Sequence, residues 1–75
     1  MAIKPTWQDF YYYLRLSRFY KIKFYDVTIG TTRTEEGWIW RKGRVGFEFE
    51  IIKNDLGIVT TLIRYRDVRA AQEII

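Results

Sequence analysis

A dense mixture of aromatic and basic residues fills the segment from Phe10 to Tyr25, FYYYLRLSRFYKIKFY. Eight of its sixteen residues are aromatic and four are Lys or Arg. Cations neutralise phosphates, and aromatic rings stack on bases at about 1–3 kcal/mol per base. This segment therefore contains the residue types that a nucleic-acid surface requires.

Periodicity assigns part of this segment to a core. Four residues at i, i+3, i+4 and i+7 share one face of a helix: Trp7, Phe10, Tyr11 and Leu14. Further along, Tyr20, Ile22 and Phe24 alternate with lysines, as in a half-buried strand. The side chains left outside combine one tyrosine with four cations, and we predict that they contact nucleic acid: Tyr12, Arg15, Arg18, Lys21 and Lys23.

A second basic group surrounds Gly43. Arg41, Lys42 and Arg44 form a charged tip between two short strands, and we expect this tip to be exposed and to extend the nucleic-acid contact. Trp38 and Trp40 precede it at a spacing of two. Strand alternation predicts that both indoles face the core.

The net charge of +4 lies in the first third of the chain. Residues 1–25 sum to +4, whereas residues 26–75 carry eight basic and eight acidic groups. This asymmetry favours an acidic partner such as nucleic acid. Four phosphate contacts would give a slope of about −3.6 in log affinity against log salt on duplex DNA.

The absence of Cys and His excludes disulfides, thiolate nucleophiles, the usual zinc sites and Ser-His or Cys-His catalysis. Glu48 and Glu50 share one face of a strand, where paired carboxylates could bind a metal or perform acid–base chemistry. With cross-strand partners such as Arg41 or Arg64, we predict an exposed ladder of ion pairs there instead. We therefore expect no enzymatic activity, no cofactor and no bound metal.

The elements that must position these residues follow from the same patterns. Thr6 is expected to cap an N-terminal amphipathic helix that ends near Leu16 or Ser17. Gly30–Gly37, GTTRTEEG, is interpreted as a mobile surface loop. Alternating apolar residues predict three or four antiparallel strands, one of which has Phe47, Phe49 and Ile51 alternating with Glu48 and Glu50. Ala70 and Ala71 favour a short helix over Arg66–Ile75.

The predicted class is α+β. It comprises an N-terminal amphipathic helix, a three- to four-stranded antiparallel sheet that is open or curled into a small barrel, and a short C-terminal helix. The 75 residues suffice for one compact domain, over residues 1–75. The longest stretch without a charge, Leu56–Ile63, is far shorter than the ~18 residues of a membrane span, so we expect a cytoplasmic protein without membrane contact.

Two family resemblances concern the second half of the chain. The order of strands and turns from Trp38, followed by a helix near Asp67, resembles the three-stranded DNA-binding modules of the plant AP2 family and of integrase arm-binding domains. Those modules read DNA with the sheet face, where this chain places Glu48 and Glu50. Separately, the run from Arg44 through Asn54 and Asp55 to Val68 is similar to the strand pair of RelE-type ribonuclease toxins, without the helical hairpin that precedes it there.

These observations give one leading hypothesis and two alternatives. The leading one is a small, non-enzymatic protein that binds DNA or RNA through largely sequence-tolerant phosphate contacts. The first alternative is an interaction module, an accessory subunit or an inhibitor, which docks on a protein or on itself as a homodimer through Tyr12, Tyr13 and Leu16. The second is a RelE-like ribonuclease that uses the same surface together with Glu48 and Arg64.

Overall fold

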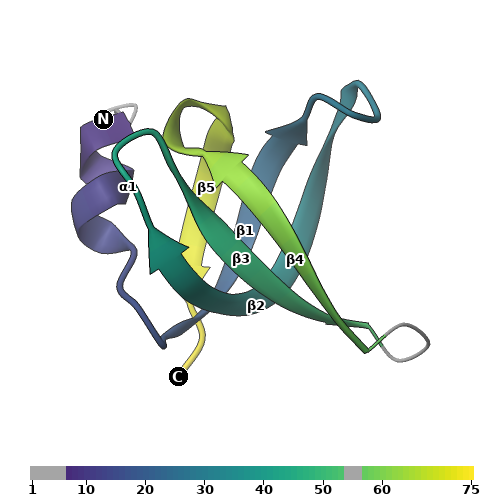
Figure 1. Ribbon diagram of the computed structural model, residues 1–75. Helices are drawn as coiled ribbons and strands as arrows, with labels where there is room; N and C mark the ends of the chain where they lie inside the picture. Colours follow the sequence, from purple (N-terminus) through teal and green to yellow (C-terminus); the bar gives the residue numbers. More distant parts are fainter. Residues whose placement is uncertain (1–6, 54–56) are drawn as a thin grey trace.

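A computed structural model describes residues 7–53 and 57–75 and contains one sheet of five antiparallel strands (Figure 1). The helix α1 (Trp7–Tyr13) is followed by β1 (Phe19–Asp26), β2 (Thr31–Lys42), β3 (Gly46–Lys53), β4 (Gly57–Arg64), the 3-10 turn η1 (Tyr65–Asp67) and β5 (Val68–Glu73). The strand order is β4-β3-β2-β1-β5, so the last strand returns beside the first. Figure 1 shows β2 bending strongly along its length, which curls the sheet around its inner face.

The α+β prediction is wrong, because residues 7–53 and 57–75 fold as a five-stranded antiparallel sheet with one seven-residue helix. The expected C-terminal helix is replaced by η1 and β5. Ala70 and Ala71 lie opposite Lys23 and Ile22 of β1 in the ladder, and Val68 is buried. The helix propensity of two alanines amounts to a few tenths of a kcal/mol each, less than pairing with β1 and burial of Val68 provide. The helix expected from the AP2-like element order is therefore absent as well.

The mobile loop predicted over Gly30–Gly37 is also wrong, since β2 begins at Thr31. These residues pair with β1 in unbroken register, from Asp26 opposite Thr31 to Tyr20 opposite Gly37. Threonine favours strands, and its polar side chain makes an exposed strand resemble a loop in sequence. The true turn, residues 27–30, is held by Asp26, whose carboxylate accepts hydrogen bonds from the Thr28 N–H at 2.9 Å and the Thr28 hydroxyl at 2.5 Å.

Helix α1 ends at Tyr13, earlier than expected. The N–H of Arg15 donates to the Tyr20 hydroxyl at 2.8 Å, outside any helical pattern. Ser17 then adopts a left-handed conformation with φ of 63°, and its N–H donates to the Ile39 carbonyl at 3.0 Å. The chain therefore leaves the helix to follow β2. The predicted Thr6 cap lies outside the described residues.

The inner face of the sheet forms the core with Phe10 of α1 and with Leu14, which directly follows the helix. The strand residues predicted to alternate inward are buried, namely Tyr20, Ile22, Phe24, Phe47, Phe49 and Ile51. Tyr11 was expected inside but lies partly exposed, with its ring edge-on to the buried Tyr65. Hydrophobic alternation therefore identified most of the core.

Gly37 determines which side of β2 faces this core. It is buried opposite Ile51, and a Cβ atom built there would overlap the carbonyl oxygen of Glu50. A glycine inside a strand often marks such a close approach of two backbones. Gly37 and Ile39 face inward, so Trp38 and Trp40 point outward, with 37% and 60% of their surface exposed. The prediction that these indoles are buried is wrong.

We predict that Gly37→Ala destabilises the protein by about 1–3 kcal/mol, because the β3 backbone must move to admit the methyl group. Gly43→Ala is the matched control, since its nearest neighbour would lie at 3.4 Å. Urea unfolding followed by circular dichroism measures both variants. Equal stability of the two would show that β2 and β3 are less closely packed than described.

Candidate nucleic-acid interface

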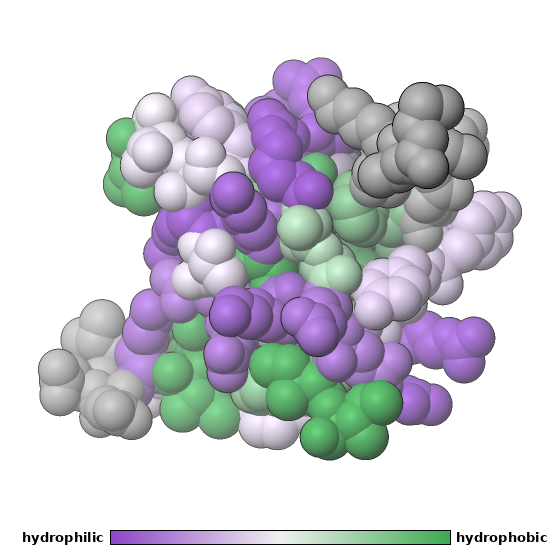
Figure 2. All heavy atoms as spheres, turned by 180° about the vertical axis from the view of Figure 1, so that it is seen from behind, coloured by the Kyte–Doolittle hydropathy of each residue, from purple (hydrophilic) through white to green (hydrophobic). Residues whose placement is uncertain are grey.

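Two of the predicted cations, Lys21 and Lys23, stand side by side on the outer face of β1. The register places Lys23 between Ala70 of β5 and Thr34 of β2, and Lys21 between Gln72 and Glu36. Because Ala70 and Thr34 are small, a shallow groove of about 510 Å³ remains between the lysines and these neighbours. Figure 2, which shows the molecule from behind, has hydrophilic side chains across its middle and hydrophobic ones toward its lower edge.

Trp38 and Trp40 occupy the same outer face on the adjoining strand β2. Trp38 lies opposite Phe19, and the two rings meet edge-on with centroids 4.9 Å apart. Trp40 stands at an irregularity in the β2–β3 register, which leaves it without a direct partner on β3. Strand alternation alone did not predict these indoles as surface residues. The sequence nevertheless holds a signal for their orientation, because Gly37 lies in phase with Ile39 and a glycine within a strand marks an inward position with little space.

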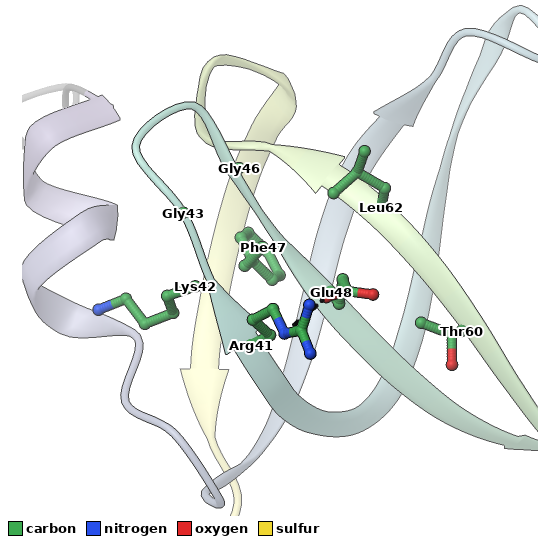
Figure 3. Close-up of a pocket in the computed structure, with 8 residues that line it drawn as sticks. All are labelled: Arg41, Lys42, Gly43, Gly46, Phe47, Glu48, Thr60 and Leu62. Carbon is green, nitrogen blue, oxygen red and sulfur yellow. Dashed lines mark ion pairs between the residues drawn. The ribbon is translucent and has the colours of Figure 1, made fainter.

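Carboxylates balance the charge of this outer face. Glu36, Glu48 and Glu50 point to the same side as Lys21, Lys23 and Arg41. Arg41 forms an ion pair with Glu48 at 3.4 Å, which agrees with the predicted salt ladder (Figure 3). The face therefore combines aromatic rings with one ion pair, and Lys21 and Lys23 form none among the described residues. Among the described residues, no three acidic side chains are grouped so that they could hold a metal ion.

The basic tip around Gly43 does not form one patch. In Figure 3 the Arg41 guanidinium points to Glu48, whereas the Lys42 side chain extends toward α1. The Lys42 ammonium donates to the carbonyl oxygens of Tyr11 and Leu14, the latter at 2.5 Å, and lies 4.4 Å from the centroid of the Tyr11 ring. Burial, together with the positive charge of Arg15, lowers the pKa of Lys42. Lys42 therefore caps the C-terminal end of α1, and its predicted exposure is wrong.

The remaining predicted residues divide between two places. Arg18 forms an ion pair with Glu73 at the end of β5, at 3.0 Å. Tyr12, Arg15 and Arg44 are exposed near the end of α1 and in the β2–β3 turn. Lys42, beside this helix end, lies six positions along β2 from Glu36, the residue opposite Lys21. The structure therefore brings Lys21 and Lys23 together and leaves the other candidates elsewhere.

Tyr65 fixes the β2–β3 turn from the inside. Its buried hydroxyl donates to the Gly43 carbonyl at 2.9 Å, and its N–H donates to the Val45 carbonyl at 3.0 Å. Burial, together with the neighbouring Tyr11, raises the pKa of Tyr65 to about 12. The turn that carries Arg44 is therefore attached to the core through this phenol.

A comparison with protein-family models, curated proteins and solved structures finds no match for the chain. Within the described residues, no helix combines the length and apolar character needed to cross a membrane.

We predict that Lys42→Met destabilises the protein by about 1–2 kcal/mol, because it leaves the carbonyl oxygens of Tyr11 and Leu14, at the end of α1, without their charged donor. The methionine retains an apolar stem of similar length. Lys23→Met is the matched control on an exposed strand position. Urea unfolding at neutral pH measures both, and an equal effect of the two substitutions would contradict the capping role.

We predict that the protein loses stability at alkaline pH, because the buried Tyr65 hydroxyl ionises less readily in the folded protein than in the unfolded chain. Its pKa is raised in the folded state from an ordinary value of 10.0, so its stabilising effect is complete below pH 10 and is lost as the pH rises toward 12. The loss should reach roughly 2 kcal/mol. Tyr65→Phe should flatten this part of the profile of unfolding free energy against pH, whereas Tyr12→Phe, at an exposed position, should leave it steep. Parallel profiles for Tyr65→Phe and the unsubstituted protein would contradict the assignment.

Proposed function

We propose that this chain binds single-stranded DNA or RNA, without strong sequence preference, on the outer face of β1 and β2. One observation carries the proposal: exposed indoles and exposed lysines share the outer face of two neighbouring strands. Trp38 lies two residues along β2 from Glu36, the partner of Lys21, and Trp40 lies two residues further along. The ammonium groups of Lys21 and Lys23 have no carboxylate within ion-pair distance among the described residues. Exposed aromatic rings next to cations are the elements that sequence-tolerant single-strand binding uses.

The indoles and the lysines of this face would bind different parts of a nucleotide. The indoles provide stacking surfaces for bases, at about 1–3 kcal/mol per base. The groove between Lys21, Lys23 and Thr34 accommodates phosphate, because the small side chains on either side leave the ammonium groups accessible. Every base has an aromatic face, so this mode of binding is tolerant of sequence.

The carboxylates of the face favour a single strand over a duplex. Duplex bases are stacked on one another and are not available to the indoles, so a duplex would contact this face mainly through its phosphates. Glu36 and Glu50, which form no ion pair among the described residues, would repel those phosphates. A single strand gains stacking that outweighs this repulsion.

The proposal is for binding without cleavage. Glu48 and Arg64, the groups that a ribonuclease on this sheet would use, are ion-paired with Arg41 and with Asp67, at 3.4 and 2.8 Å. A cytoplasmic location belongs to the same proposal, since a chain without Cys requires no oxidising compartment.

We predict that a labelled single-stranded oligonucleotide binds more tightly than the matching duplex, measured by fluorescence anisotropy. With two phosphate contacts, the slope of log affinity against log salt should be about −1.4 for a single strand. Trp40→Ser should weaken binding roughly 5- to 150-fold, the equivalent of one lost stacking contact of about 1–3 kcal/mol. Lys21→Gln with Lys23→Gln should bring the salt slope close to zero.

Tyr12→Ser and Arg44→Gln are the controls, because these exposed residues lie near the helix end and not on the proposed face. They should leave the affinity unchanged. Equal binding of duplex and single strand, or equal losses for the control and test variants, would contradict the proposed site.

The exposure of Tyr12 and Leu16 favours a second candidate function, a protein-interaction module. Tyr12 is 77% exposed, and Leu16 is exposed in the segment that follows α1. Large apolar side chains of this kind are common in protein interfaces. Absence of any affinity for oligonucleotides in the titration above would favour this second function over the first.

A further inference from the structure

The edge strand β4 lacks the features that normally protect a sheet edge. Among the described strands it pairs only with β3, in an eight-residue register without a bulge. Its sequence, GIVTTLIR, contains no proline and no charge before Arg64, and five of its eight residues are β-branched. Natural edge strands are usually short, bulged, charged or interrupted by proline. A pocket of about 400 Å³ separates the second half of β4, from Thr60 to Arg64, from the end of β1 and the turn that follows it. No described strand pairs with the free side of β4, so its backbone N–H and C=O groups are available to another strand.

The opposite edge of the sheet differs from β4. The strand β5 has six residues, which include Arg69 and Glu73, and its pairing with β1 is shifted between Lys23 and Phe24. These features are protective devices of the usual kind. Only one of the two edges is therefore suited to strand addition.

The outward side chains of β4 form an apolar surface next to this free edge. Ile58 and Leu62 are 64% and 74% exposed, and Ile52 of β3 lies directly opposite Ile58 in the ladder. Thr60 stands between Ile58 and Leu62 on the same face. A strand added to this edge would cover these side chains as well as the backbone groups.

We propose that β4 pairs antiparallel with β4 of a second copy of this chain, about a two-fold axis at Thr60. This pairing would place Ile58 opposite Leu62 of the partner subunit and Thr60 opposite Thr60 of the partner subunit. Apolar side chains then face each other across the axis, as stable cross-strand pairs require. The two sheets join into one, and the two-fold symmetry closes the assembly at a dimer.

The register follows from the pattern of β4 itself. An axis at Thr61 would place Arg64 opposite the exposed Ile58, so a charge would face an apolar side chain. An axis between two residues would place the exposed apolar side chains of one strand on one face of the joined sheet and those of the partner strand on the other face. Only the axis at Thr60 sets both large exposed side chains against each other.

Cysteine cross-linking tests this register directly, because the chain contains no Cys. In antiparallel pairs, directly opposite Cα atoms are about 4.5–5.5 Å apart, within the range that a disulfide spans. Thr60→Cys should therefore form a covalent dimer under mild oxidation. Thr34→Cys, exposed on the central strand β2, and Gln72→Cys, exposed on β5, are the controls and should form little covalent dimer.

Two results of this experiment would overturn the proposal. Cross-linking of Thr60→Cys no more efficient than that of Thr34→Cys would exclude the pairing of β4 with itself. A mixed disulfide between Thr60→Cys and Gln72→Cys chains, formed in preference to the Thr60→Cys dimer, would show that β4 pairs with β5 of the next copy.

Light scattering provides a second measurement on the full chain. The mass should be twice the 9.2 kDa of one chain, and Leu62→Lys should reduce it to that of a monomer with the circular dichroism spectrum unchanged. Val45→Lys, at an exposed position in the β2–β3 turn, should remain dimeric. A monomeric unsubstituted protein, or a dimeric Leu62→Lys variant, would contradict the proposal. The inference is independent of nucleic-acid binding, so Trp40→Ser should also remain dimeric.

Discussion

The close approach of β3 to Gly37 is the constraint on which the outer face of this sheet depends. Only a residue without a side chain fits where the Glu50 carbonyl lies, so Gly37 faces inward and Ile39 follows it. Because alternate residues of a strand point to opposite faces, Trp38 must then face outward. The ladder places Glu50 opposite Trp38 on β3, so the same constraint sets the charged residues of that strand on the outside.

Several of the basic side chains that could have bound a ligand instead form hydrogen bonds or ion pairs within the fold. Lys42 caps α1, Arg18 is paired with Glu73, and Arg33 lies over the Phe24 ring while it contacts Asp26 and Glu35. The last arrangement is tight: the Arg33 Nε lies 3.0 Å from the Asp26 carboxylate, but without a well-directed hydrogen bond. A positive net charge in the sequence therefore overstates the basic surface of the folded chain.

The sequence predicted those parts of the fold in which side-chain alternation and burial agree. Tyr20, Ile22 and Phe24 in β1, and Phe47, Phe49 and Ile51 in β3, were identified because each run has one apolar face. The first half of β2 and all of β5 were not, since their stability comes from pairing with β1, which no local pattern reveals. In the candidate site, Lys21 and Lys23 followed from alternation with the core. The two tryptophans did not, because their large apolar area favoured burial until the backbone contact at Gly37 was known.

The orientation of Trp40 is the central claim of this account, and acrylamide quenching of its fluorescence tests it most directly. A chain with Trp7→Phe and Trp38→Phe retains Trp40 as its single tryptophan. Because this indole is mostly exposed, its quenching constant in the folded protein should be close to that in the urea-unfolded chain. A quenching constant several-fold lower in the folded protein would place Trp40 in the core, and the register of β2 described above would then be wrong.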